Sequence, residues 1–402
     1  MTRLASFARM KELMTGYYLE AKTTREKPVI WLTSGAPVEY VYAAGALPVY
    51  PENYAAMCAA SHQAPLLLEA AEAQGYSPDI CSYARTDFGQ DLLRGGPAGG
   101  LPPPQALVCA TNICRTVVKW FEAVARKNRA PLFVVDMPFL HDGLTREALN
   151  YVLGQFRALE GFLAAQTGSA FDREQLLATV SLSREATGLW RKTLDLARHR
   201  PAPITALDAF VHIAPIVTLR GTPQCRDYYR ELHREVADRV ARGEGAIPRE
   251  RYRVLWDNLP IWHRMRWFET FFAERGLTLA AATYPNSWAA IEPPPGFQAD
   301  DPLEALAVSY LNLYIHFGFT QRIDYLERLI EEFALTGFIM HSNRSCKPYS
   351  VGMYGLREEL SRRTGLPGVV IEADQNDPRQ FTEARTVTAL EAFLEAMEPI
   401  DG

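Results

Sequence analysis

The chain has 402 residues, of which 48% are hydrophobic and 22% are charged. This predicts a globular protein of two to three domains, each able to bury a core. The 42 Lys and Arg against 47 Asp and Glu give a net charge of −5, too near neutral for a nucleic-acid partner or an anionic membrane. No apolar run reaches the ~20 residues of a spanning helix, and the charged, amphipathic start is not a signal peptide. We therefore expect a cytoplasmic protein.

Short apolar runs alternate with helical stretches in the first third of the chain. A helical period covers residues 4–18, and strand-like runs follow at 28–32, 47–50, 106–110 and 132–135. These runs are apolar throughout and do not alternate between polar and apolar residues. That pattern is typical of a parallel sheet covered on both faces.

In the remainder of the chain the predicted secondary structure changes twice. From about 145 to 242 it reads as long helices, and strand-like runs then return at 253–256, 277–282, 338–340 and 369–371. A turn-rich segment within this last part is expected to be a loop, at 284–302. The pattern predicts two sets of parallel strands separated by helices.

The predicted fold class is α/β, with two Rossmann-like lobes that carry short parallel sheets and are joined by a helical segment. The expected divisions are an N-terminal helix plus first lobe at 1–143, the helical segment at 144–245, and the second lobe at 246–402. Ligands of parallel sheets bind beyond the carboxyl ends of the strands. The cleft between the lobes is therefore the expected site.

Six cysteines are the most informative residues of the composition. In a chain of this length without an export signal, free thiols or metal ligands are favoured over disulfides, and the sequence contains no C-x-x-C pair. They are Cys58, Cys81, Cys109, Cys114, Cys225 and Cys346.

Three of these cysteines lie at strand-end or helix-start positions: Cys114 and Cys346 come just past strand-like runs, and Cys81 follows a turn where a helix is expected to start. Helix N-termini favour thiolate, and thiolates are the main ligands of iron–sulfur clusters. The alternative is that each is a small buried hydrophobic residue, as free cysteines commonly are. That reading is favoured for Cys109, inside a strand, and for Cys225, inside the helical segment.

Two further polar residues follow strand-like runs. Glu52 could hold or release a proton in a semi-apolar cleft, although its position after Pro51 fits an acid at a helix N-terminus better. Ser34 could donate a hydrogen bond to a bound carbonyl group or cap the helix that begins near Pro37.

Several familiar motifs are missing from the sequence. It contains no G-x-x-x-x-G-K-[ST] phosphate loop, no G-x-G-x-x-G between a strand and a helix, no G-x-S-x-G elbow and no H-E-x-x-H. We therefore expect no nucleotide-binding site in this chain. From the residues alone, the prediction ends at a two-lobed α/β protein with a candidate iron–sulfur site in its cleft.

Several segments together resemble the benzoyl-CoA reductase and 2-hydroxyacyl-CoA dehydratase family of cluster-binding subunits, and the resemblance spans nearly the whole chain. The segments are 33–39 (TSGAPVE), 50–53 (YPEN), 79–83 (DICSY), 112–114 (NIC), 341–348 (HSNRSCKP) and 372–379 (EADQNDPR). Each would be weak alone, but their order and spacing are specific.

The resemblance implies roles for the residues singled out above. Cys81, Cys114 and Cys346 would hold one [4Fe–4S] cluster, with its fourth iron position open or differently filled. Ser34 would lie near the thioester of the substrate, and Glu52 would be the acid or base. The role of Cys58 and the choice between a substrate-binding and an electron-relay subunit stay open.

The resemblance also implies partners. A second homologous cluster subunit would pair with this chain, and separate activator ATPase subunits would use ATP to deliver low-potential electrons, with ferredoxin as the upstream donor. The missing phosphate loop agrees with ATP being used by the partner. The substrate would be an aromatic acyl-CoA.

Within the family we favour an iron–sulfur subunit of a benzoyl-CoA reductase, an oxidoreductase that reduces the aromatic ring of benzoyl-CoA to cyclohexadiene-carbonyl-CoA. The intact TSGAPVE and YPEN segments and the split of 35 Arg to 7 Lys support this choice. The first alternative is a subunit of an (R)-2-hydroxyacyl-CoA dehydratase, a lyase that works through a ketyl radical. A stand-alone double-cubane cluster reductase is a further alternative.

Overall fold

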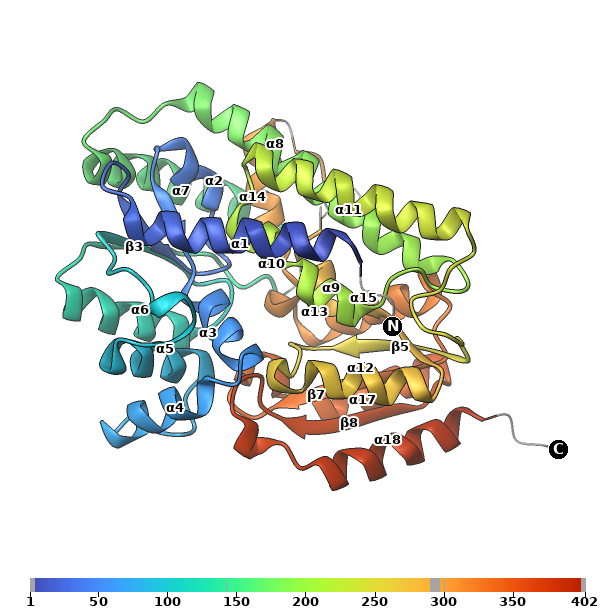
Figure 1. The fold of residues 1–402 in the computed structure, drawn as a ribbon. Helices are drawn as coiled ribbons and strands as arrows, with labels where there is room; N and C mark the ends of the chain where they lie inside the picture. Colours follow the sequence, from blue (N-terminus) through green and yellow to red (C-terminus); the bar gives the residue numbers. More distant parts are fainter. Residues whose placement is uncertain (1–3, 142, 290–296, 300, 399–402) are drawn as a thin grey trace.

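Two parallel four-stranded sheets form the framework of the protein (Figure 1). The structure is a computed structural model, and it describes residues 4–141, 143–289, 297–299 and 301–398. Both sheets have the same topology, in which the second strand in sequence lies at one edge and the first strand lies beside it. This confirms the predicted α/β class with two Rossmann-like lobes.

The first sheet has the order β2-β1-β3-β4. Its strands are β1 (Val29–Leu32), β2 (Leu47–Val49), β3 (Ala106–Ala110) and β4 (Leu132–Val135). Every residue of β1 and β3 is buried, as expected for a sheet with both faces covered. The helices of this part are α1 (Ser6–Thr23), α2 (Val38–Ala43), α3 (Pro51–Ala60), α4 (Ala64–Ala73), α5 (Ser82–Leu93) and α6 (Arg115–Asn128).

The second sheet has the order β6-β5-β7-β8. Its strands are β5 (Tyr252–Asp257), β6 (Leu277–Ala282), β7 (Gly337–Asn343) and β8 (Gly368–Ala373). The register between β5 and β6 shifts at Val254 and Leu255. The helices of this part are α12 (Met265–Glu274), α13 (Thr283–Asn286), α14 (Pro302–Leu311), α15 (Phe319–Glu332), α16 (Lys347–Ser350), α17 (Met353–Thr364) and α18 (Glu383–Met397).

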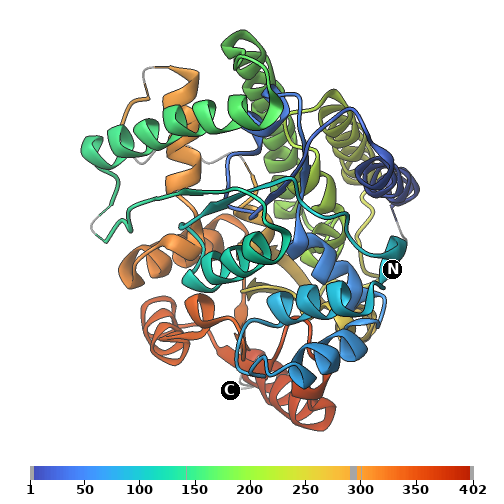
Figure 2. The ribbon, with the colours of Figure 1, turned by 90° about the vertical axis from the view of Figure 1, so that its left-hand side faces the viewer.

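A helical segment connects the two sheets in sequence. It contains α7 (Arg146–Thr167), α8 (Arg173–Asp195), α9 (Ala206–His212), α10 (Ala214–Thr218) and α11 (Pro223–Ala241). Helices α8 and α11 run side by side over the top of the molecule in Figures 1 and 2, and the second sheet lies below the first. Five short 3₁₀ helices complete the described elements, at Pro97–Gly99, Leu196–Arg198, Trp262–Arg264, Tyr314–His316 and Pro378–Gln380.

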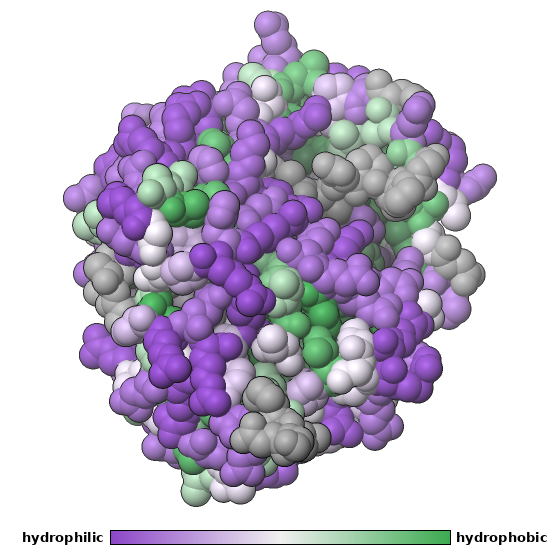
Figure 3. Space-filling model, turned by 90° about the vertical axis from the view of Figure 1, so that its right-hand side faces the viewer, coloured by the Kyte–Doolittle hydropathy of each residue, from purple (hydrophilic) through white to green (hydrophobic). Residues whose placement is uncertain are grey.

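All eight strand-like runs predicted from the sequence form strands. The expected loop at 284–302 is only partly tested, because 290–296 and 300 lie outside the described residues, and its first residues belong to α13. The division at 143 and 245 stays a prediction. No helix within the described ranges is both long and apolar enough to cross a membrane. Figure 3 shows a largely hydrophilic face on which hydrophobic side chains form small, partly recessed patches.

Candidate functional site

A cavity of about 1670 Å³ lies between the lobes, at the carboxyl ends of the strands. Ser34, just past β1, and Cys346, just past β7, both line it, together with Arg220 of the helical segment. The two sheets therefore direct their strand ends to one space. This is where ligands bind in parallel α/β sheets.

Three cysteine sulfurs line this cavity, and each belongs to the residue that caps a helix N-terminus. Cys81 caps α5, Cys114 caps α6 and Cys346 caps α16. Backbone N–H groups of the first helical turn act to lower the pKa of each thiol: those of Tyr83 and Ala84 act on Cys81, and those of α6 and α16 act on the other two cysteines. Such N–H groups stabilise a thiolate over a thiol.

The three sulfurs also interact electrostatically. Burial raises the pKa of Cys81 to about 12, with a further contribution from Cys114, and burial raises the pKa of Cys346 with contributions from Cys81 and Cys114. As free groups they are therefore thiols at neutral pH. A bound cation reverses this balance because it favours the thiolate form.

Among the described residues, no group of three or more His, Cys, Asp and Glu side chains lies close enough to bind a metal ion. The three sulfurs are thus not arranged around one ion such as Zn²⁺, whose sulfur ligands lie at about 2.3 Å. In an iron–sulfur cluster the cysteines bind separate iron atoms, which spaces the sulfurs further apart. Three partly buried thiols that raise one another's pKa, each at the N-terminus of a helix, fit that donor set.

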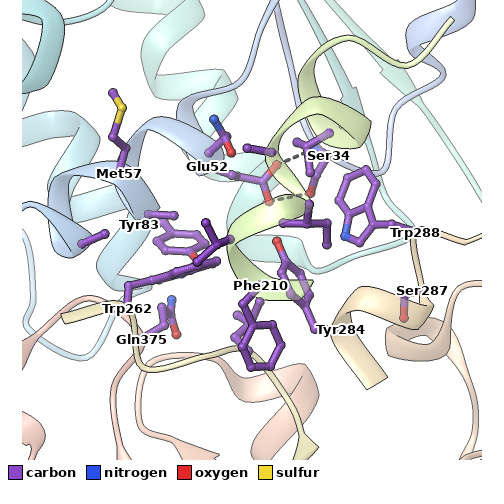
Figure 4. Close-up of a pocket in the computed structure, with 18 of the residues that line it drawn as sticks. Ser34, Glu52, Met57, Tyr83, Phe210, Trp262, Tyr284, Ser287, Trp288 and Gln375 are labelled. Carbon is purple, nitrogen blue, oxygen red and sulfur yellow. Dashed lines mark hydrogen bonds between the residues drawn. The ribbon is translucent and has the colours of Figure 1, made fainter. Parts of the chain in front are cut away.

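Ser34 and Glu52 face each other across the ends of β1 and β2 (Figure 4). The Ser34 backbone N–H donates to Glu52 Oε2 at 2.5 Å, and the Ser34 hydroxyl donates to Oε1 at 3.0 Å. Burial raises the pKa of Glu52 to about 7, although both hydrogen bonds from Ser34 lower it. The carboxyl group can therefore exchange a proton near neutral pH.

The backbone around Ser34 is fixed by a close contact. Asn112 Nδ2 donates to the carbonyl oxygens of Gly35, at 3.1 Å, and Tyr310, at 2.8 Å. A Cβ on Gly35 would lie only 2.2 Å from Asn112 Oδ1, so glycine is required here. On the other side, Pro51 starts α3 and places Glu52 in its first turn.

A buried ion pair joins the three parts of the chain beside this site. The carboxylate of Glu39, in the first lobe, accepts hydrogen bonds from Ser183 Oγ at 2.5 Å, Arg220 Nε at 3.1 Å and the Tyr310 hydroxyl at 2.7 Å. Arg220 Nη2 also donates to the Tyr310 hydroxyl at 2.5 Å. Glu39 and Arg220 are 1% and 8% exposed, so their charges stabilise each other away from solvent.

The charges along the cavity wall are unevenly distributed. The lining includes five basic side chains that are at least partly exposed: Lys11, Lys22, Arg184, Arg264 and Arg266. Of the described residues that line the cavity, the acidic ones are Glu39 and Glu52, which hydrogen-bond to neighbouring side chains in the interior. The outer wall is thus positive in a chain whose net charge is −5.

Aromatic side chains form much of the inner wall (Figure 4). They are Tyr83, Phe210, Trp262, Tyr284 and Trp288. The Trp262 indole donates to the Tyr83 hydroxyl at 2.5 Å, and the rings of Trp262 and Tyr284 meet edge to face at 6.5 Å. A flat or apolar group can be enclosed between such rings.

The other three cysteines lie in the core. Cys109 is buried in β3, Cys225 is buried in α11 with its thiol 3.4 Å from the Pro215 carbonyl oxygen, and Cys58 is buried among Tyr17, Tyr18, Tyr54 and Leu67. This agrees with the predicted core positions of Cys109 and Cys225. It also places Cys58, which the sequence left undecided, in a separate packing cluster.

The sequence did not single out Arg220, Tyr310 or Gln375. Gln375 lies in the resembling segment 372–379, two residues past the end of β8, and that position could have drawn attention to it. Arg220 and Tyr310 have no local signal, because their partner Glu39 lies 181 and 271 residues away in the chain.

The chain matches known proteins over almost its full length. The family model for the 2-hydroxyglutaryl-CoA dehydratase D-component covers residues 33–397. The (R)-2-hydroxyisocaproyl-CoA dehydratase alpha subunit of Clostridioides difficile is 31% identical, over 97% of this chain and 95% of that protein. The (R)-phenyllactyl-CoA dehydratase alpha subunit of Clostridium sporogenes is 29% identical, over 94% and 91%. A subunit of the benzoyl-CoA reductase of Thauera aromatica is also 29% identical, over 98% and 95%.

Proposed function

Since the chain belongs to the 2-hydroxyglutaryl-CoA dehydratase D-component family, we propose that it is an iron–sulfur subunit that transfers single electrons to an acyl-CoA thioester. We further propose that its reaction is the reduction of benzoyl-CoA, in which two electrons and two protons convert the aromatic ring to a cyclohexadiene. The observation that carries the proposal is that three helix-capping thiols and the Ser34–Glu52 pair line one cavity.

In this proposal Cys81, Cys114 and Cys346 hold a [4Fe–4S] cluster, with its fourth iron position open or differently filled. The donor set supports it, because each thiol caps the N-terminus of a helix, and the charges of the sulfurs raise one another's pKa. When bound, the cluster supplies one electron at a time. Cys58 is not a ligand in this proposal, since its side chain is buried in a separate group of hydrophobic residues.

The Ser34 hydroxyl is suited to the thioester carbonyl oxygen. Negative charge develops on that oxygen when an electron is added, and a hydroxyl donor aimed at it stabilises this charge in a site closed to water. To do so, the hydroxyl turns away from Glu52 Oε1, while the Ser34 backbone N–H keeps its bond to Oε2. Glu52 then holds the proton to be delivered, because its pKa of about 7 keeps it partly protonated at neutral pH.

The charge pattern of the cavity supports a CoA ester as the ligand. The phosphates of CoA would meet the basic outer wall, where Arg184 and Arg266 are exposed and line the cavity. The acyl group would then reach the inner wall, where aromatic rings such as Trp262 and Tyr284 surround it. This lining supports a planar aromatic acyl group.

A second candidate is the alpha subunit of an (R)-2-hydroxyacyl-CoA dehydratase. Two observations favour it: the highest identity quoted above is to such a subunit, and a further relative is named for phenyllactyl-CoA, whose side chain is also aromatic. The same residues would serve either reaction up to the first electron transfer. Afterwards the dehydratase expels a hydroxyl group, whereas the reductase protonates the ring.

The same proposal implies partner subunits for this chain. The relatives are themselves named as single subunits of larger enzymes, which supports a second, homologous cluster subunit. An activator ATPase would supply the electrons, with ferredoxin as its donor, and the missing phosphate loop in this sequence fits ATP use by that partner.

The proposal is tested on the full chain, purified without oxygen and reconstituted with iron and sulfide. We expect an electron paramagnetic resonance signal of a reduced [4Fe–4S] cluster, and quenching of tryptophan fluorescence by benzoyl-CoA that free benzoate does not cause. A chain that takes up no cluster contradicts the proposal. Tighter binding of (R)-phenyllactyl-CoA than of benzoyl-CoA selects the dehydratase.

A further inference from the structure

A rigid turn after β8 places a buried amide beside one of the three thiols. Asp374 Oδ1 accepts hydrogen bonds from the backbone N–H groups of Asn376, at 2.8 Å, and Asp377, at 3.0 Å. The Gln375 carbonyl oxygen accepts from the Trp262 N–H at 3.1 Å. Gln375 is therefore held from two directions, and it is 0% exposed.

The Gln375 side chain reaches the sulfur of Cys81. Its Nε2 lies 3.7 Å from Cys81 Sγ, within hydrogen-bond range for sulfur, and Gln375 also lines the cavity (Figure 4). Its Oε1 is buried and has no hydrogen-bond partner among the described residues. If the amide were flipped, this oxygen would face an electron-rich sulfur, so a thiolate at Cys81 selects the orientation in which the N–H donates.

The same turn fixes the relative position of two of the thiols. Asp374 Oδ2 accepts hydrogen bonds from the backbone N–H of Ser345, at 3.2 Å, and from its hydroxyl. The Ser345 Oγ in turn accepts from the Ser82 N–H at 3.0 Å. Ser82 follows Cys81 and Ser345 precedes Cys346, so this chain of bonds holds the two cysteines at a set separation across the lobes. The Gln375 amide therefore has little freedom to move away from the sulfur.

We propose that Gln375 is a positioning residue that donates a hydrogen bond to the Cys81 thiolate and thereby raises the reduction potential of the cluster. This inference rests on the proposed function, because it requires the three thiols to hold that cluster. An N–H donor withdraws electron density from a ligating sulfur and so stabilises the reduced form. Without this donor the cluster is harder to reduce.

The test compares the full chain with Gln375→Met, which keeps the length of the side chain but removes its donor. Both are reconstituted with iron and sulfide, and the cluster is titrated with a graded reductant while its electron paramagnetic resonance signal is followed. We expect equal iron content and a more negative midpoint for Gln375→Met. The expected size is about tenfold in the redox equilibrium, or 59 mV for a one-electron couple.

Two further variants separate tuning from structural damage. Gln375→Glu keeps the shape but places a carboxylate near the thiolate, and we expect its midpoint to be more negative than that of Gln375→Met. Gln90→Met makes the same change at a buried glutamine of α5, the helix that Cys81 caps, and we expect the wild-type midpoint.

The outcomes distinguish this inference from the proposed function. A wild-type chain that binds no cluster contradicts the proposed function. A wild-type cluster whose midpoint is unchanged in both Gln375 variants overturns the role of Gln375 and leaves the cluster assignment intact. If Gln375→Met loses its cluster, the isosteric Gln375→Glu variant decides: a wild-type midpoint there also overturns the inference.

Discussion

The two lobes share a strand order but present different chemistry at their strand ends. The sheets run β2-β1-β3-β4 and β6-β5-β7-β8, so β3 and β7 occupy the same place in each. Cys114 follows β3 and Cys346 follows β7, and each caps the next helix. At this position the two lobes therefore share both the place of the strand in the sheet and a cysteine that caps the next helix.

The strand ends of two other pairs, β1 with β5 and β2 with β6, do not match. After β1 and β2 come Ser34 and Glu52, which bond to each other at the cavity. At the end of β5, Asp257 is 1% exposed and accepts a hydrogen bond from the Thr283 hydroxyl at 2.8 Å. Tyr284 follows β6 and lines the cavity as an uncharged phenol, because burial raises its pKa. The topology thus supplies similar positions in both lobes, and in the proposed reaction single residues decide which lobe exchanges protons.

The largest expected effect is the loss of the cluster when the cysteine after β3 or the cysteine after β7 is replaced. Cys114→Ser and Cys346→Ser should each lose the cluster, because a serine hydroxyl is a poor substitute for a thiolate ligand of iron. The measurement is iron content and absorbance after reconstitution. Cys225→Ser is the matched control in α11 and should keep the cluster. Loss with Cys225→Ser but not with Cys114→Ser would reverse the assignment.

The next largest expected effect is on turnover, and it tests whether Glu52 of the first lobe supplies a proton. Glu52→Gln should fold and keep the cluster, but its turnover should fall by about 10²- to 10⁴-fold, the range for losing a general acid. In the wild type, kcat should decrease as pH rises through about 7, since that is the pKa at which Glu52 loses its proton. The Gln variant should lack this decrease. Full activity in Glu52→Gln would make Glu52 a structural residue.

The contact between the lobes predicts an effect on stability. Arg220→Met leaves the buried Glu39 carboxylate without its cation, which should lower the free energy of unfolding by about 3–5 kcal/mol. Denaturant unfolding measures this change. Arg230→Met removes an exposed pair with Asp227 and should cost no more than about 1 kcal/mol. Equal effects of the two variants would mean that the buried network does not join the lobes.

The sequence predicted the strands well because each is a short, continuous apolar run, as at 106–110 and 338–340. It also placed three cysteines at strand ends or at a helix start, since the polar turn at the end of an apolar run is a local pattern. It could not predict the Glu39–Arg220–Tyr310 network, because burial of a charge depends on partners far away in the chain. The raised pKa of Glu52 has the same origin: desolvation comes from packing that no local pattern contains.

The smallest expected effect is at Asp257, the last residue of β5 in the second lobe. Burial raises the pKa of Asp257, as it does for Glu52. For each group the folded protein retains a proton that the unfolded chain has lost, so stability falls as pH rises from the unfolded to the folded pKa. Asp257→Asn should remove its part of this fall while changing kcat less than twofold, because its carboxylate bonds to Thr283 and does not line the cavity. Unfolding and kcat measured from about pH 4, near the unfolded pKa of aspartate, to about pH 8 check both statements. A loss of turnover as large as that of Glu52→Gln would show that both lobes supply proton chemistry, and the functional contrast between them would then fail.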